Sequence, residues 1–62
     1  EKLGRLEGVA NQYANLGSVY EKRGDTEMAR EYWEKALELF KKIGMKPEIE
    51  KTQQAIDGLK DK

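Results

Sequence analysis

Two pairs of glutamates have a spacing that could support acid–base or metal chemistry. Glu27 with Glu31, and Glu34 with Glu38, would each lie one turn apart on a helix. Paired carboxylates could bind a hard cation or exchange a proton, but no loop of further oxygen ligands with a glycine accompanies them. Such spacing is common on solvated helices, and we therefore expect neither a metal site nor a catalytic site.

The composition argues against several other kinds of site. The 62 residues include no cysteine and no histidine, which removes thiolate ligands and the commonest acid–base side chain. No phosphate-binding glycine loop or nucleophile motif is present, so we expect no cofactor. Basic and acidic residues number 12 each, and the basic clusters at 41–42 and 60–62 are diluted by acids. We therefore expect no nucleic-acid binding.

The hydropathy pattern predicts a soluble chain. No apolar run exceeds two residues, which is too short for a membrane span or the hydrophobic region of a signal peptide. We expect no membrane partner and a cytoplasmic location. High charge could also indicate disorder, but five aromatic residues at helical spacing argue for a packed core: Tyr13, Tyr20, Tyr32, Trp33 and Phe40.

The first of three predicted helices covers residues 7–23. Apolar residues recur there at steps of four, three and four, which places on one face Val9, Tyr13, Leu16 and Tyr20. Small residues on the flank would let another helix approach closely: Ala10, Ala14 and Gly17. A glycine inside a helix costs about 1 kcal/mol relative to alanine, so Gly17 needs such a packing reason. Gly24 would turn the chain, and Asp25 would cap the next helix.

Two further helices are predicted over residues 26–43 and 47–59. The second helix carries a stripe of Ala29, Trp33, Ala36, Phe40 and Ile43. Gly44 would end it, and Pro47 suits the first turn of the third helix because its missing N–H would have no partner there. The third helix has one narrow stripe, typical of a terminal helix that covers a core: Ile49, Thr52, Ile56 and Leu59.

An internal echo relates the two ends of the chain. The residues Lys-Leu-Gly at 2–4, followed by Val9, return 40 positions later as Lys-Ile-Gly at 42–44, followed by Ile49. The same offset places Leu16 over Ile56. We therefore expect three parts, namely a remnant of a preceding repeat or connection, a helix pair, and a connection with a capping helix: 1–8, 9–43 and 44–62.

From Ala10 to Ile43 the residues resemble the tetratricopeptide repeat family. The family signature appears in order and spacing as Tyr13-x2-Leu16-Gly17-x2-Tyr20, Gly24-Asp25, Ala29-x3-Trp33 and Ala36. The period of 40 is similar to the extended repeats of bacterial and archaeal arrays, and the usual closing proline is absent at Lys41. The resemblance implies an all-α antiparallel helix-turn-helix with a capping helix, a fragment of an α-solenoid. The residues expected to define this fold are Leu16, Gly17, Tyr20, Ala29 and Ala36.

The resemblance also implies a protein-interaction scaffold, and not an enzyme. In the family, first helices of successive repeats line a groove for a peptide or protein, and the matching residues here are Asn11, Asn15, Ser18 and Lys22. Amides that donate and accept suit a peptide backbone, and Lys22 could meet a carboxylate. The same surface could equally be the solvent-exposed face of an amphipathic helix, without a binding role.

Self-association is an alternative function. A solenoid cut at both ends exposes faces that would otherwise meet the next repeat, so two copies could form a homo-oligomer or exchange helices about residues 44–47. The residues expected at inter-repeat or self-association contacts are Leu6, Val9, Ala10, Tyr13, Ala14, Trp33 and Phe40. Trp33 could also stack on a base or a sugar, but its spacing with Ala29 and Ala36 indicates packing.

Overall fold

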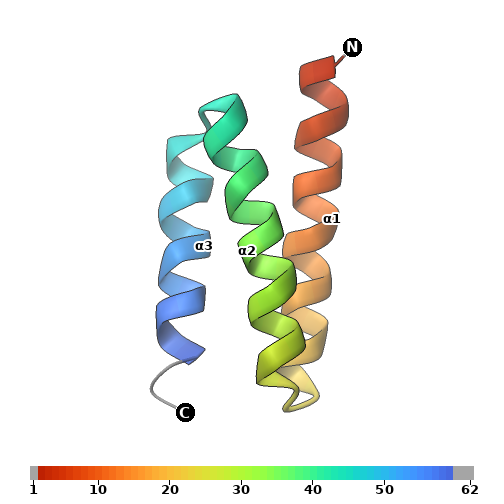
Figure 1. Ribbon diagram of the computed structural model, residues 1–62, viewed down its shortest axis with the longest axis vertical. Helices are drawn as coiled ribbons and strands as arrows, with labels where there is room; N and C mark the ends of the chain where they lie inside the picture. The colour runs from red at the N-terminus through yellow and green to blue at the C-terminus, as the bar shows by residue number, and fades with distance from the viewer. Residues whose placement is uncertain (1, 60–62) are drawn as a thin grey trace.

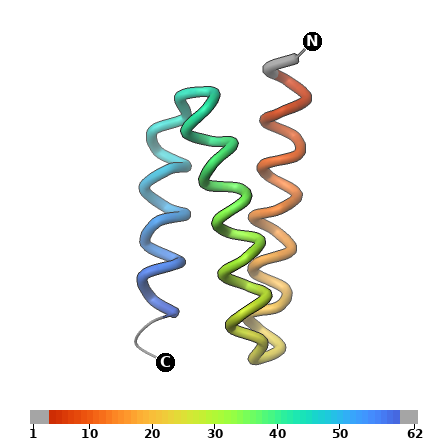
Figure 2. Tube along the Cα trace, viewed as in Figure 1, coloured from red at the N-terminus to blue at the C-terminus, as the bar shows by residue number. Residues whose placement is uncertain are grey.

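The computed structural model describes residues 2–59, with side chains from residue 4 onward, as three helices lying side by side (Figure 1). They are α1 (Lys2–Lys22), α2 (Thr26–Ile43) and α3 (Lys46–Leu59), and no strand occurs in this part of the chain. The helices alternate in direction, and α2 lies between α1 and α3 in the view of Figure 2; the extents are 37 × 17 × 13 Å. The predicted all-α fold, an antiparallel helix pair followed by a third helix, is confirmed.

Two glycines turn the chain between the helices. Gly24 and Gly44 have left-handed backbone conformations, with φ of 85° and 74°, which a residue with a Cβ adopts only under strain. After Gly44, the Met45 N–H donates to the Phe40 carbonyl at 3.0 Å and closes the last turn of α2. Asp25 caps the start of α2, because its Oδ1 accepts from the backbone N–H three residues later at 3.2 Å. Both turns agree with the sequence prediction.

The first helix is longer than the sequence pattern predicted. α1 begins at Lys2 rather than near residue 7, and it runs through Gly4 without a break. Gly4 and Gly44 match in the sequence repeat but differ in local structure, since Gly44 ends a helix and Gly4 lies inside one. A glycine costs a helix only about 1 kcal/mol. The position that matches Pro47 is Glu7, which does not interrupt a helix.

Residues 2–8, expected to be a remnant of a preceding repeat or a connection, lie within α1. The wider division of the chain into 1–8, 9–43 and 44–62 stays a prediction, and residues 1 and 60–62, with the basic cluster at the C-terminus, lie outside the described part. α3 begins at Lys46, one residue earlier than expected, and Pro47 lies in its first turn.

Small residues bring α1 and α2 close together. Gly17 is buried, and a Cβ added to it would clash with the indole ring of Trp33. The Trp33 Nε1–H donates to the Ala14 carbonyl at 2.9 Å, so the ring also binds the backbone of α1. A second buried cluster at this interface consists of Ala10, Ala36 and Phe40. The packing reason expected for Gly17 is therefore found.

α3 covers the other side of α2 with a stripe of mostly aliphatic residues. Thr52 and Ile56 are buried, and Ile56 belongs to the cluster that contains Ala29, Trp33 and Leu37. Three half-buried residues of α3 pack against the same cluster: Ile49, Ala55 and Leu59. The stripe predicted for the third helix is thus the face that meets α2.

The buried face of α1 is not the one that its large residues predicted. Val9 and Leu16 are exposed, whereas Ala10 and Gly17, the next residues along the helix and roughly a quarter turn away, are buried. Large apolar side chains mark a stripe in the sequence, but a close helix crossing needs the smallest residues at its centre. Leu16 is therefore not part of the core within this chain, contrary to its expected role, and Tyr20 is half-buried at the edge of the core.

Candidate functional site

The predicted peptide-contact residues form one exposed strip along α1, which we call the polar strip: Asn11, Asn15, Ser18 and Lys22. The Ser18 hydroxyl donates to the Ala14 carbonyl at 3.2 Å, which leaves its oxygen lone pairs to accept from a partner. Both asparagine amides can donate and accept, and Lys22 adds a positive charge in the last turn of the helix. The binding role of the strip stays a prediction.

An apolar hollow adjoins the polar strip on α1. It has a volume of about 380 Å³ and is lined by Gln12, Asn15, Leu16 and Val19. Leu16 and Val19 expose much of their side chains there, and Asn15 stands at the border between the strip and the hollow. Gln12 and Val19 were not predicted from the sequence as residues of a binding surface. Their signal was a second helical stripe, because Gln12, Leu16 and Val19 follow one another at steps of four and three.

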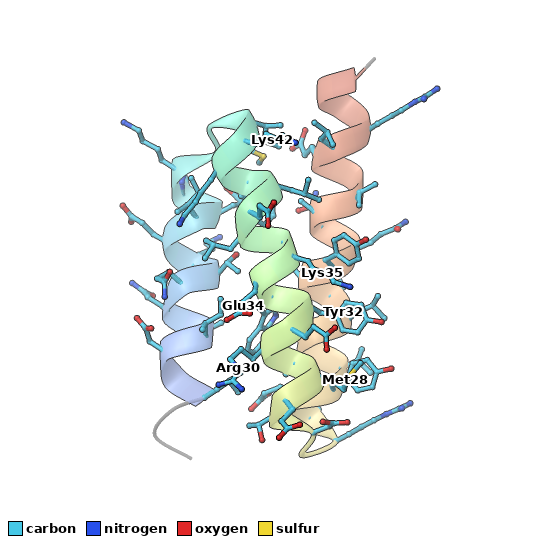
Figure 3. The ribbon with its side chains drawn as sticks, viewed as in Figure 1. Met28, Arg30, Tyr32, Glu34, Lys35 and Lys42 are labelled. Atoms are coloured by element: carbon cyan, nitrogen blue, oxygen red, sulfur yellow. The ribbon has the colours of Figure 1, made fainter. Side chains whose placement is uncertain are left out.

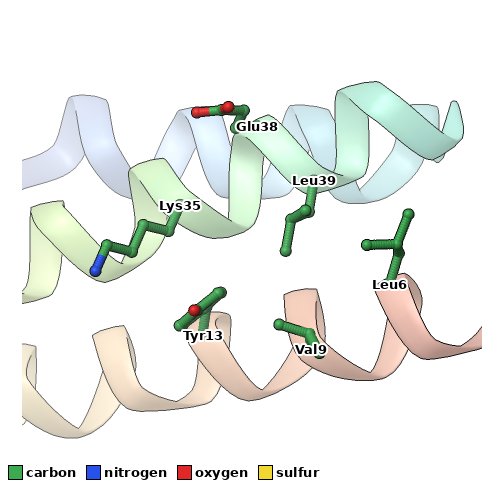
Figure 4. A pocket seen from close by; sticks show the side chains of 6 residues that line it. All are labelled: Leu6, Val9, Tyr13, Lys35, Glu38 and Leu39. Atoms are coloured by element: carbon green, nitrogen blue, oxygen red, sulfur yellow. The ribbon is translucent and has the colours of Figure 1, made fainter.

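A second hollow of about 290 Å³ lies between α1 and α2, and Figure 4 shows the six residues that line it: Leu6, Val9, Tyr13, Lys35, Glu38 and Leu39. The Lys35 side chain reaches from α2 toward α1, where its Nζ lies 5.7 Å from the centre of the Tyr13 ring. The Glu38 carboxylate points away from α1 in the same view. This hollow offers an apolar floor with one ammonium group at its edge.

Three tyrosines pack across the seam between α1 and α2. Tyr32 stacks on Tyr20 with ring centroids 5.5 Å apart and planes inclined by 3°, and its centroid lies 5.9 Å from that of Tyr13. The Lys35 Nζ lies 5.5 Å from the centre of the Tyr32 ring, and both side chains are on the α1 side of α2 (Figure 3). The Arg23 guanidinium carbon lies 5.9 Å from the centre of the Tyr20 ring. The sequence did not predict this tyrosine cluster, because stacking depends on how the two helices face each other.

Three of the residues expected at self-association contacts are used inside the chain. Ala10, Trp33 and Phe40 are buried, so they are not available to a second molecule in this conformation. Ile49 of α3 packs against both the cluster that contains Trp33 and the cluster that contains Phe40. The remaining candidates lie at the surface to different degrees, with Val9 exposed and the others half-buried: Leu6, Tyr13 and Ala14.

The glutamate pairs of α2 are exposed along their whole series: Glu27, Glu31, Glu34 and Glu38. Within residues 2–59, no three His, Cys, Asp or Glu side chains are placed to hold a metal ion together. Over the same described range, no helix combines the length and the apolar character needed to cross a bilayer.

Comparison with known proteins identifies the helix pair. The family model of the tetratricopeptide repeat matches residues 10–42, which include Gly17 and Trp33 at the crossing of α1 and α2. The curated proteins and the solved structures give no match. The matched stretch is more than half of the chain and contains the close packing that joins its first two helices. The chain therefore belongs to the tetratricopeptide repeat family.

Proposed function

We propose that this chain is a protein-interaction scaffold that presents a tetratricopeptide-repeat surface to a peptide or protein partner. Repeats of this family generally mediate protein–protein interaction and are typically non-enzymatic scaffolds. The observation that carries the proposal is the exposed polar strip beside the apolar hollow over Leu16. Amides next to an apolar depression offer hydrogen bonds to a peptide backbone and a place for an apolar side chain.

The strip favours a short extended peptide with a carboxylate. Lys22 can bind the carboxylate, and Asn15 can donate to a peptide carbonyl while it accepts from a peptide N–H. The two residues are seven positions apart, or about 10 Å along a helix that rises 1.5 Å per residue. An extended peptide covers that distance with about three residues. An apolar side chain beside the contact to Asn15 would then reach Leu16 in the hollow.

The proposal includes what the scaffold does not do. It acts without catalysis or a cofactor, in the cytoplasm, and binds neither nucleic acid nor membrane. The balance of 12 basic and 12 acidic residues supports this, because a chain without net charge has no long-range field that would draw it to a polyanion.

Peptide binding is tested by selecting a synthetic peptide from a displayed random library and titrating it against the whole chain. We expect Asn15→Ala to weaken the affinity about five-fold, the effect of losing a hydrogen bond worth about 1 kcal/mol. The matched control is Gln54→Ala on the exposed side of α3, which should leave the affinity unchanged. Unchanged affinity in Asn15→Ala would remove this residue from the site. NMR shift changes confined to α3 would remove the whole strip.

Self-association is a second candidate function, favoured by the large apolar residues that α1 exposes: Val9, Leu16 and Val19. Two copies could bury these side chains in a mutual contact, or exchange helices about residues 44–47. Sedimentation equilibrium and thermal unfolding over a range of concentrations test this. Mass and melting temperature that rise with concentration would support it, whereas a folded monomer throughout would exclude it.

A further inference from the structure

The outer helices α1 and α3 carry the same apolar stripe. Each of three large aliphatic residues of α1 has an aliphatic counterpart 40 positions later in α3: Val9 with Ile49, Leu16 with Ile56, and Val19 with Leu59. In both helices the three residues are separated by seven and then three positions, so they lie along one side of the helix.

The two stripes differ in what covers them. In α3 the central residue, Ile56, is 4% exposed because the stripe lies on the α2 cluster around Trp33. In α1 the stripe residues Val9, Leu16 and Val19 are 40%, 39% and 44% exposed. The apolar hollow on α1 is part of this difference. The counterparts of its four lining residues are buried or half-buried in α3: Thr52, Ala55, Ile56 and Leu59.

We propose that the α1 stripe is a docking surface for α2 of a second copy of this chain, on the face that α3 covers in the single molecule. The proposal rests on the self-association function above and names its surface and its partner. α3 and the α1 helix of a neighbouring copy carry the same stripe, so they compete for one face of α2. The contact is heterologous, because it joins different surfaces of the two copies, and further copies can add at either end.

α3 has the advantage in this competition at low concentration. It is tied to α2 by the short connection at Gly44 and Met45, and a short tether gives an effective concentration of about a millimolar. Its stripe is also better suited to burial, because Thr52 stands where α1 has the larger and more polar Gln12. The unaltered chain should therefore be mainly monomeric when dilute and should associate as its concentration approaches that of the tethered helix.

The first experiment makes α1 a better competitor without touching the core. Gln12 is exposed in the middle of the stripe, and Gln12→Leu should raise the association constant of the full chain about ten-fold, because one more leucine is buried at the contact. Asn11→Leu is the matched control, since Asn11 is exposed on the same helix but outside the stripe. Sedimentation equilibrium of the two variants and the unaltered chain measures the effect.

The second experiment weakens α3 in the full chain. Ile56→Asp places a charge against the cluster around Trp33 and should release α3, so that association increases beyond that of Gln12→Leu. Adding Leu16→Lys to Ile56→Asp should return the mass to that of a monomer, because the lysine lies in the docking stripe. Circular dichroism checks that the loss of helix does not exceed the 14 residues of α3. If the loss is larger, the comparison of Gln12→Leu with Asn11→Leu decides alone.

The outcomes separate this surface from self-association in general. Association that is stronger in Gln12→Leu than in Asn11→Leu supports the docking surface. Equal association in both variants and the unaltered chain would leave self-association standing but overturn the α1 stripe as its surface. A monomeric Gln12→Leu at millimolar concentration would overturn the inference and the self-association function together, whereas peptide binding is decided separately by Asn15→Ala.

Discussion

The two sides of α2 are packed by different means. Toward α1, Gly17 leaves room for the Trp33 ring where no side chain would fit, and the indole donates a hydrogen bond to Ala14. Toward α3, aliphatic side chains such as Ile56 lie on the cluster around the same tryptophan. A ring seated on a glycine fits in one arrangement, whereas aliphatic burial depends mainly on area and can be supplied by any helix with a similar stripe. The α1 interface is therefore specific, and the α3 interface is replaceable.

Breaking the glycine contact should have the largest effect. Gly17→Val places carbon atoms where the Trp33 ring lies, and we expect a loss of about 3 kcal/mol in the free energy of unfolding because the ring must leave its position. Urea unfolding followed by circular dichroism measures the loss. Gly8→Val on the same helix is the control, since nothing lies within 4 Å of an added Cβ there. Similar losses in both variants would mean that the Gly17 contact does not hold the helix pair together.

The two equivalent stripes should respond unequally to truncation. Ile56→Ala should cost about 2 kcal/mol, because a buried side chain leaves a cavity against α2. Leu16→Ala, its counterpart on α1, should cost less than about 0.5 kcal/mol in dilute solution, because the side chain is exposed. Urea unfolding of both variants at the same low concentration tests the contrast. A cost for Leu16→Ala as large as that of Ile56→Ala would contradict its exposure in the single molecule.

Substitutions at the turns should lower stability less than Ile56→Ala does, and their effects should be confined to particular helices. Gly24→Ala and Gly44→Ala should each cost about 1 kcal/mol, since both glycines have positive φ. Amide hydrogen exchange separates the two variants: Gly44→Ala should speed exchange mainly in α3, whereas Gly24→Ala should speed it in α1 and α2. Faster exchange over the whole chain in Gly44→Ala would contradict the idea that α3 is attached separately from the helix pair.

The helices and turns were predictable because they depend on neighbouring residues. Gly24 with Asp25, and Gly44 before Pro47, carry their turn and cap signals in the local sequence, and the structure has both turns where expected. The beginning of α1 was not predictable in this way. Gly4 weakens a helix without ending it, so the outcome depends on the residues around it and not on the glycine alone.

The orientation of α1 is where the sequence prediction of the site was incomplete. The exposure of Asn11 and Lys22 follows from helical periodicity, and the structure places both at the surface. The hollow beside Asn15 could not be predicted from periodicity, because large residues suggested that Leu16 was buried. Which side of α1 faces α2 is decided by the size of the Trp33 ring and the absence of a side chain at Gly17. The Tyr20–Tyr32 stack has the same origin.

The packing of the helices in chain order determines how contact area grows with chain length. α2 packs on α1, and α3 packs on α2, with buried clusters at these contacts. Each helix added in this way covers one side of its predecessor and contributes a new exposed side, so accessible area increases in proportion to the number of helices. In a globule, area lags behind mass. A ligand that lies along successive helices can therefore touch several of them without any of them moving apart.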